Sequence, residues 1–239
     1  MNSVSVKNIQ KKFKTKEALK DISVVFKKNS ITGLLGPNGS GKTTLFNIIT
    51  GFVDSDAGSI YIDDEEVSAY SLHKRSELGL TYLPQEASIF RDLTVYENIL
   101  SVAELFIAKD RISEKVNQLI RDFSLEEFIK RKGKFLSGGE RRRTEIARAL
   151  ACEPSFIMMD EPFAGIDPIA IQEVKDTIAK LKRNNIGIII TDHNVREALK
   201  IVDYAHIIYK GSLIREGQPN DIVKDEFVKK IYLGQDYQD

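Results

Sequence analysis

The alternation of apolar and polar positions predicts strands and helices that follow one another along most of the chain. Short apolar runs bounded by turn-forming residues are typical of strands, whereas apolar residues spaced three or four positions apart are typical of helices. Strands are predicted at residues 4–9, 22–26, 30–35, 58–63, 80–83, 155–159, 187–190, 204–209 and 212–215. Strands that alternate with helices indicate an α/β fold with a largely parallel sheet, in which ligands bind at the carboxyl ends of the strands.

Helical spacing is clearest in the middle of the chain. Residues 94–128 carry apolar side chains at helical intervals, so this stretch is interpreted as a helical insertion between two strands. Further helices are predicted at residues 44–50, from residue 137 to near residue 154, at 170–182 and, as two short pieces, after residue 219. Lys210 and Gly211 separate the last two strands and favour a hairpin.

A glycine-rich loop between the strand at 30–35 and the helix at 44–50 fits the complete pattern G-x-x-x-x-G-K-[ST]. Its glycines let the backbone turn tightly, so that N–H groups point at phosphate oxygens, and the following helix presents its positive end. Lys42 is placed to reach the β- and γ-phosphates, and the Thr43 hydroxyl to bind Mg²⁺. The alternative, a glycine turn without a ligand, is much weaker once the flanking strand and helix are counted. The predicted nucleotide-binding residues here are Gly36, Pro37, Asn38, Gly39, Ser40, Gly41, Lys42, Thr43 and Thr44.

Polar residues follow three further strands at the point where each ends. Asp160 and Glu161 end an apolar strand, and two carboxylates there are costly unless they handle a cation or a proton. Beside a phosphate loop, Asp160 fits an acid on the Mg²⁺ side, and Glu161 fits the residue that orients or deprotonates the attacking water. His193 can bond a γ-phosphate oxygen, although a single histidine is usually a satisfied surface residue. Gln85 is predicted to coordinate the metal through its amide.

Two more segments allow both a functional and a plain structural interpretation. Ser137, Gly138 and Gly139 form a second glycine turn that feeds a helix, and therefore a second candidate anion site. The alternative is an ordinary helix start with Ser137 as its cap. Phe13 lies in a basic stretch, and its ring either packs beneath a solvated hairpin or stacks on a nucleobase.

Composition narrows the class of protein. The 239 residues hold 35 Lys and Arg against 35 Asp and Glu, so no overall positive field favours nucleic acid as a partner. A single cysteine, Cys152, excludes an internal disulfide framework and fits a reducing compartment. The N-terminus lacks the apolar core of a signal peptide, and the longest apolar runs are too short to cross a bilayer. We therefore expect a cytoplasmic protein that can attach to a membrane through a partner.

Taken in chain order, these motifs resemble the complete motif set of ABC-transporter ATPases. They correspond to Walker A (Gly36 to Thr43), Q-loop (Gln85), signature (Leu136 to Glu140), Walker B (Asp160, Glu161), D-loop (164–167) and H-loop (His193). Two small departures are Glu140, where Gln is commoner, and Phe13, which replaces the usual Tyr.

The resemblance implies a P-loop fold with three parts. These are a RecA-like core at residues 1–86 and 155–239, an antiparallel β subdomain within it, and an inserted α-helical subdomain at residues 87–154. It also implies that Phe13 stacks on the base, that ATP and Mg²⁺ are the ligands, and that the protein forms a head-to-tail homodimer. Each ATP would then lie between the phosphate loop of one copy and Ser137 to Gly139 of the other.

Residues 82–91, 191–197 and 228–237 resemble more narrowly the ATPase subunits of lipopolysaccharide exporters. This implies a subunit that powers extraction of lipopolysaccharide together with two permeases, on the cytoplasmic face of the inner membrane. Residues 88–93 would line the groove for a permease helix, with Phe90 as apolar anchor, Arg91 as polar contact and Leu93 beside them, unless this is only a surface loop.

Two other functions remain open from the sequence. An importer ATPase of the branched-chain amino-acid type shares every catalytic motif. A soluble ABC module, for iron–sulfur cluster assembly or on nucleic acid, lacks support because the chain has no duplicated half, coiled-coil arm, strong basic patch or cysteine cluster.

Overall fold

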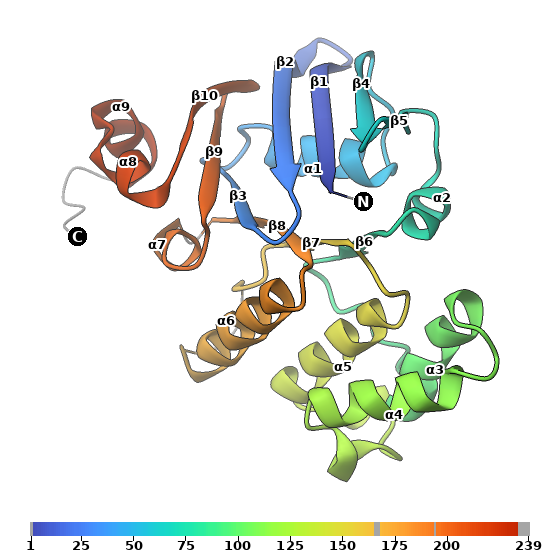
Figure 1. The fold of residues 1–239 in the computed structure, drawn as a ribbon. Coiled ribbons are helices and arrows are strands. Elements are labelled where there is room, and N and C mark those ends of the chain that lie inside the picture. Colours follow the sequence, from blue (N-terminus) through green and yellow to red (C-terminus); the bar gives the residue numbers. More distant parts are fainter. Residues whose placement is uncertain (1, 165–167, 194, 234–239) are drawn as a thin grey trace.

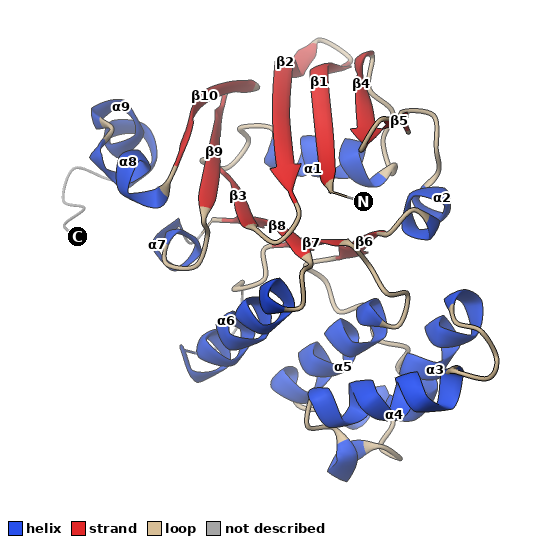
Figure 2. Cartoon of the chain, viewed as in Figure 1, coloured by secondary structure: helices blue, strands red, loops and turns tan. Residues whose placement is uncertain are grey.

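The computed structural model describes residues 2–164, 168–193 and 195–233. Within this part of the chain, ten strands form one sheet in the order β5-β4-β1-β2-β10-β9-β3-β8-β7-β6 (Figures 1 and 2). The strands are β1 (Ser3–Phe13), β2 (Lys16–Lys27), β3 (Ile31–Leu35), β4 (Ala57–Ile62), β5 (Glu65–Glu66), β6 (Leu80–Leu83), β7 (Phe156–Asp160), β8 (Gly187–Asp192), β9 (Tyr204–Tyr209) and β10 (Ser212–Gly217). The α/β class is confirmed.

The sheet is parallel at its centre. Strands β9, β3, β8, β7 and β6 all pair in parallel. Every residue of β3, β7 and β8 is buried, which explains why these strands read as continuous apolar runs in the sequence. The register pairs Leu35 with Asp192, and Asp160 with Thr191. The residues that follow these strands therefore emerge at one edge of the sheet.

The other half of the sheet is antiparallel. Strands β1, β2, β4 and β5 form what we call the β block, which joins β10 through a single parallel pair, Asp21 with Ser212. The prediction of a largely parallel sheet thus holds for the centre only, because a strand pattern does not reveal the direction of its partner. β1 and β2 are also longer than predicted, and only Lys14 and Thr15 separate them.

Helices cover the sheet and form a separate cluster beside it (Figure 2). They are α1 (Lys42–Thr50), α2 (Leu72–Glu77), α3 (Val95–Phe106), α4 (Ile112–Asp122), α5 (Gly138–Leu150), α6 (Pro168–Arg183), α7 (Val195–Leu199), α8 (Pro219–Lys224) and α9 (Glu226–Val228), with a last helical turn at Lys229–Leu233. The predicted helical stretch 94–128 contains α3 and α4, and a capping box between Thr94 and Glu97 starts α3.

Helix α2 is not predicted from the sequence, because its six residues carry too few apolar positions to show a period. Its Arg75 is nevertheless buried. The guanidinium donates to the carbonyls of Ile48 and Ile49, both at 2.6 Å, and to the Ser68 carbonyl at 3.0 Å. A cation thus satisfies carbonyls at the end of α1 and ties that helix to the segment that follows β5.

Two apolar clusters make up the core. One contains β-block residues such as Val4 and Ile60 together with Leu45 and Phe46 of α1. The other runs from the centre of the sheet into helices α3, α4 and α5, which lie together at one end of the molecule in Figure 1. The predicted helical subdomain, residues 87–154, therefore shares this apolar core with the centre of the sheet.

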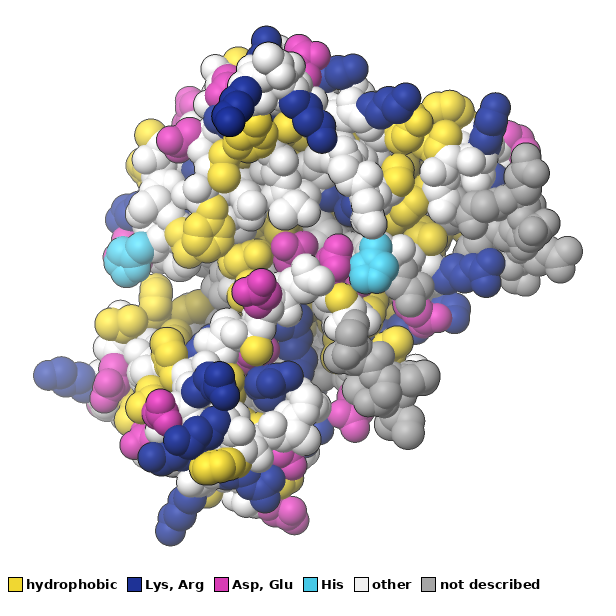
Figure 3. Space-filling view, turned by 180° about the vertical axis from the view of Figure 1, so that it is seen from behind, with side chains coloured by type: hydrophobic (Ala, Val, Ile, Leu, Met, Phe, Trp, Pro, Cys, Tyr) yellow, Lys and Arg dark blue, Asp and Glu magenta, His cyan; other side chains and the backbone are white. Residues whose placement is uncertain are grey.

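The surface gives no sign of a single-sign charge field on the face shown in Figure 3, where basic and acidic side chains are intermixed. None of the helices in the described ranges has both the length and the apolar character that a membrane span requires.

Candidate functional site

The phosphate-loop segment begins where β3 ends and leads directly into α1. Gly36 has φ 151°, and a Cβ there would lie 2.1 Å from the Ile208 carbonyl oxygen, so only glycine fits. Gly41 precedes α1 in a left-handed conformation and makes no side-chain cap. The N–H groups of the first turn are therefore available to an anion.

The side chains of the loop fit an anionic ligand. Lys42 is 6% exposed, and its Nζ donates to the carbonyls of Gly36 at 2.7 Å and Pro37 at 3.1 Å. Burial lowers the pKa of Lys42, whereas the nearby carboxylates of Glu161, Asp160 and Asp192 raise it. The Ser40 hydroxyl is buried without a hydrogen-bond partner among the described residues. A buried cation, an unpaired hydroxyl and a helix N-terminus together suit phosphate oxygens.

Asp160 is held at the end of β7 by two hydroxyl groups. It accepts a short hydrogen bond from Thr191 and a longer one, 3.4 Å, from the Tyr82 hydroxyl. Burial, followed by the charge of Asp160, raises the pKa of Tyr82 to about 12, so this tyrosine stays a donor. The roles of Tyr82 and Thr191 are not predicted from the sequence, although Tyr82 lies three residues before Gln85 and Thr191 two residues before His193.

Glu161 brings the remaining strand-end residues together. Its Oε2 accepts from Gln85 Nε2 at 2.8 Å and lies 3.0 Å from His193 Nδ1. Its backbone has φ 44°, an unusual value for a residue other than glycine, and its N–H donates to the Thr191 carbonyl at 2.9 Å. The structure therefore joins Gln85, Glu161 and His193, which lie far apart in the sequence, around one carboxylate oxygen.

The predicted metal-binding residues Thr43, Gln85 and Asp160 offer a hydroxyl, an amide and one carboxylate. Thr43 is exposed in the first turn of α1, and no group of three or more His, Cys, Asp or Glu residues that could hold a metal occurs in the described ranges. Oxygen ligands with a single carboxylate are the kind that Mg²⁺ takes, because it keeps water and phosphate oxygens as most of its ligands. The assignment stays a prediction.

Phe13 lies at the tip of the β block with 48% of its surface exposed, and Lys11 Nζ is 5.4 Å from the ring centre. The interpretation that this ring packs beneath a hairpin is wrong, because β1 extends to Phe13 and leaves the ring outside the core. The remaining interpretation, stacking on a base, stays a prediction.

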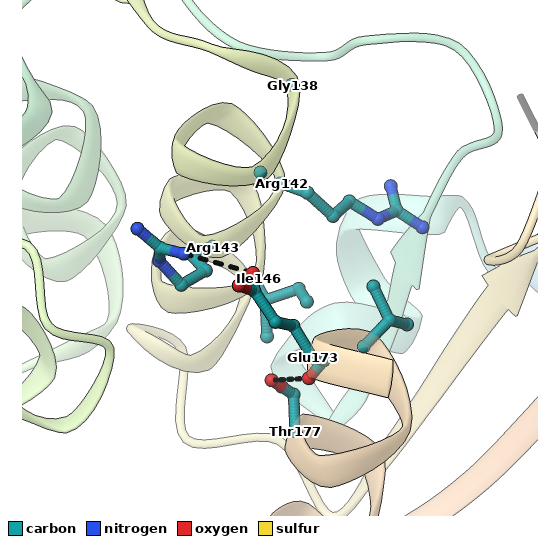
Figure 4. Close-up of a pocket in the computed structure, with 8 residues that line it drawn as sticks. Gly138, Arg142, Arg143, Ile146, Glu173 and Thr177 are labelled. Atoms are coloured by element: carbon teal, nitrogen blue, oxygen red, sulfur yellow. Dashed lines mark hydrogen bonds and ion pairs between the residues drawn. The ribbon is translucent and has the colours of Figure 1, made fainter. Parts of the chain in front are cut away.

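Ser137 caps α5 as the structural interpretation predicts. Its Oγ accepts from the Glu140 N–H at 3.3 Å, and Glu140 Oε2 accepts from the Ser137 N–H at 2.8 Å. Gly138 has open space beside it, and Figure 4 shows it at the start of α5, above a small pocket between α5 and α6. Figure 1 places this turn in the helical cluster, away from α1.

The predicted partner-contact loop is exposed at Phe90 and Arg91 and half-buried at Leu93, and it is firmly held. Asn98 of α3 accepts from the Phe90 N–H at 2.9 Å and donates to the carbonyls of Phe90, Leu93 and Thr94 at 3.1, 3.2 and 2.9 Å. The Phe90 ring is half exposed beneath the Arg148 guanidinium at 4.7 Å.

Helix α5 holds the beginning of the same loop. The buried Glu145 accepts from the N–H groups of Ser88 at 2.7 Å and Ile89 at 3.1 Å. Arg91 is exposed. The loop thus presents Phe90 and Arg91 on a rigid base.

Two predicted features lie outside the described residues. These are residues 165–167 of the predicted D-loop and the end of the C-terminal segment from residue 234. Of the D-loop, Ala164 is described, and its N–H donates to the Glu161 carbonyl at 3.1 Å.

Comparisons with known proteins show the family and the fold of the chain. The family model described as ABC transporter matches residues 19–164. The lipopolysaccharide export system ATP-binding protein LptB of Escherichia coli K12 is 46% identical over 99% of both chains, and LptB of Haemophilus influenzae shows the same identity and coverage. Among solved structures, the ADP conformation of MJ1267, an ATP-binding cassette of an ABC transporter, superposes with a TM-score of 0.87 at 29% identity, covering 98% of this chain and 100% of that one.

Proposed function

Because this chain belongs to the ABC transporter ATPase family, we propose that it is the ATP-hydrolysing subunit of a lipopolysaccharide exporter. The observation that carries the proposal is the convergence of Lys42, Asp160 and Glu161 at one sheet edge, in a chain that matches lipopolysaccharide export ATPases along its full length. The family assignment makes the chain an ATP hydrolase coupled to transport. The proposal adds the residues that do the work, the partners and the substrate.

Phosphate binding rests on the loop and on Lys42. The ammonium group now bonded to the Gly36 and Pro37 carbonyls would turn to the β- and γ-phosphates, while Ser40 and the loop N–H groups surround them. Thr43 and Gln85 would hold Mg²⁺, with Asp160 behind it. The metal supplies charge neutralisation on the phosphates.

Hydrolysis rests on Glu161 and His193. The carboxylate of Glu161 would orient and deprotonate the attacking water. Its contacts with Gln85 and His193 fix the orientation of this carboxylate. His193, which is half exposed, would bond the γ-phosphate through its imidazole. Positioning and charge neutralisation provide most of the catalysis in such a site.

A homodimer completes each site. Phe13 would stack on the base, and the Ser137, Gly138 and Gly139 turn of a second copy would cover the phosphates. The open space at Gly138 and the separation of this turn from α1 within one chain support this arrangement. Binding of two ATP molecules would close the dimer, and hydrolysis would reopen it.

The loop from Ser88 to Leu93 would receive a permease helix. Phe90 would be the apolar anchor, and Arg91 and Leu93 would contact the helix around it. The subunit would thereby lie on the cytoplasmic face of the inner membrane, with lipopolysaccharide as the substrate of the assembled complex. The balanced charge of the chain gives no reason to add nucleic acid as a partner.

The test is affinity purification of the tagged chain from detergent-solubilised native membranes, followed by identification of the co-purified proteins. Two lipopolysaccharide-export permeases support the proposal. A pair of amino-acid permeases would keep the ATPase mechanism and overturn the substrate. Absence of any membrane partner would overturn the exporter assignment and favour a soluble module.

The proposed contact loop has its own control within this experiment. Arg91→Ala is expected to preserve ATP binding by the isolated subunit and to reduce the recovered permeases. Arg121→Ala, which removes an exposed arginine on α4, is expected to change neither. Loss of ATP binding in Arg91→Ala would contradict a coupling role for the loop.

A further inference from the structure

The C-terminal segment of the described chain returns to the edge of the sheet where the site lies. Ile222 of α8 and Val228 of α9 are fully buried in the larger apolar cluster. Asp225, between these two helices, caps α9 by accepting from the Val228 N–H at 2.9 Å and pairs with Arg215 of β10. These contacts fix the start of the last helical turn, Lys229–Leu233.

Tyr232 is the residue of this turn that reaches the site. Its hydroxyl donates to the backbone carbonyl of Asp192 at 3.1 Å, and its ring packs against the larger apolar cluster. The Asp192 carbonyl belongs to the peptide bond that leads into His193. A hydrogen bond to this carbonyl therefore fixes the peptide plane from which the His193 side chain projects.

The bonded carbonyl lies beside the start of the phosphate loop, because Asp192 pairs with Leu35, the residue that precedes Gly36. Burial raises the pKa of Tyr232, the Gly36 backbone N–H lowers it, and the charges of Asp192 and Glu161 raise it further. The upward effects prevail, so the phenol stays protonated and remains a donor to Asp192. One hydrogen bond thus ties the C-terminal segment to the place where the phosphate loop and the strand before His193 lie side by side.

The side chain of Asp192 strengthens this arrangement from the other side. It is fully buried, and its Oδ2 accepts from the Phe163 N–H at 3.2 Å. Both the side chain and the carbonyl of Asp192 are therefore bonded, and the Tyr232 bond is the one that comes from the C-terminal segment.

We propose that Tyr232 is a positioning residue for ATP hydrolysis, which holds His193 in register with the phosphate loop. It acts through the Asp192 carbonyl and does not touch the nucleotide. The inference rests on the role of His193 proposed above, and it is independent of the transported substrate.

The test compares Tyr232→Phe, which removes one oxygen and keeps the ring, with the parent chain. We expect kcat for ATP hydrolysis to fall by about three- to tenfold. This is the change that follows when the free energy of one lost hydrogen bond is added to the activation free energy of hydrolysis. KM for ATP should stay within about twofold, because the loop amides that bind phosphate are unchanged. The thermal midpoint should fall by only about 2–4 °C, which is the expected effect of one lost hydrogen bond in a chain of this size. A kcat equal to that of the parent chain would overturn the proposal.

Two further variants separate a positioning role from general disturbance. Tyr209→Phe removes a hydroxyl from a tyrosine whose ring packs on Phe227 in the same C-terminal region, and it should leave kcat unchanged. An equal loss of kcat in Tyr209→Phe would overturn the assignment to Tyr232.

His193→Ala distinguishes failure of this inference from failure of the proposed site. If His193→Ala loses hydrolysis and Tyr232→Phe does not, the site stands and the positioning role of Tyr232 is wrong. If His193→Ala keeps full hydrolysis, the proposed role of His193 is wrong. The proposal that Tyr232 acts by positioning His193 is then wrong as well. Loss in both variants, with binding preserved in Tyr232→Phe, supports the proposal.

Discussion

Asn98→Ala should loosen the loop that presents Phe90 without affecting the nucleotide site. Asn98 is fully buried on α3, and its amide makes four hydrogen bonds to the backbone of Phe90, Leu93 and Thr94. The substitution removes all of them and leaves the Phe90 N–H without its acceptor. Thr94 keeps its capping box with Glu97, so α3 itself should persist.

The magnitude follows from the bonds that are lost. The amide oxygen accepts one bond and the two amide hydrogens are shared among three carbonyls, so about three full bonds at about 1 kcal/mol net each amount to roughly 3 kcal/mol. The loop lies at the surface, and water that reaches the freed carbonyls reduces this to about 2–3 kcal/mol. The equilibrium for local opening should then rise by roughly 30- to 150-fold.

Amide hydrogen exchange measures this directly. We expect the amides of residues 88–93 to exchange faster by that factor, while those of β3 and α1 change only as much as global stability requires. Asn117→Ala on α4 is the matched control, because Asn117 is exposed and its amide makes one weak contact with Ser113 at 3.5 Å. Unchanged protection of the loop in Asn98→Ala, with global destabilisation alone, would refute the reasoning.

Three further predictions concern the site. Glu161→Gln should bind ATP, accumulate as an ATP-bound dimer in size-exclusion chromatography, and hydrolyse ATP about 10²–10⁴-fold more slowly; brisk turnover would remove Glu161 from the chemistry. Gly36→Ala should lower the thermal midpoint well below that of Gly39→Ala, because both positions have positive φ but only at Gly36 does a Cβ also meet a backbone oxygen, that of Ile208, and equal midpoints by circular dichroism would contradict the clash. For Tyr82, a folded-state pKa of about 12 against an ordinary 10.0 means that its stabilising contribution is complete below pH 10 and is lost as pH rises toward 12. Urea titrations of Tyr82→Phe should therefore show a shallower loss of stability over that interval, and identical slopes would exclude the effect.

The sequence reveals those parts of the fold and site that depend on local pattern. The phosphate loop can be recognised in the sequence because its glycines, its lysine and the flanking strand and helix are contiguous. Asp160 and His193 could be found because parallel strands end at one edge of a sheet, which places residues at strand ends together without knowledge of strand order.

Features that depend on distant partners could not be predicted. The burial of Arg75 requires the carbonyl end of α1, more than twenty residues earlier in the chain. The contact of Tyr232 with Asp192 joins residues forty positions apart. The apolar and polar pattern of neither segment predicts this contact. Pairing of β10 with β2 likewise follows from packing and not from propensity.

The single pair between Asp21 and Ser212 has a mechanical consequence for the whole chain. Together with the bond from Lys20 N–H to the Gly211 carbonyl, it makes only a short backbone seam, whereas β3 and β8 share five consecutive pairs. The β block is held mainly by side-chain packing in the smaller apolar cluster, where it meets α1 and central strands such as β3 and β7. The block carries Phe13 at the end of β1, and α1 begins at Lys42. The distance between these two residues is therefore set by apolar packing and not by the backbone bonds of the seam.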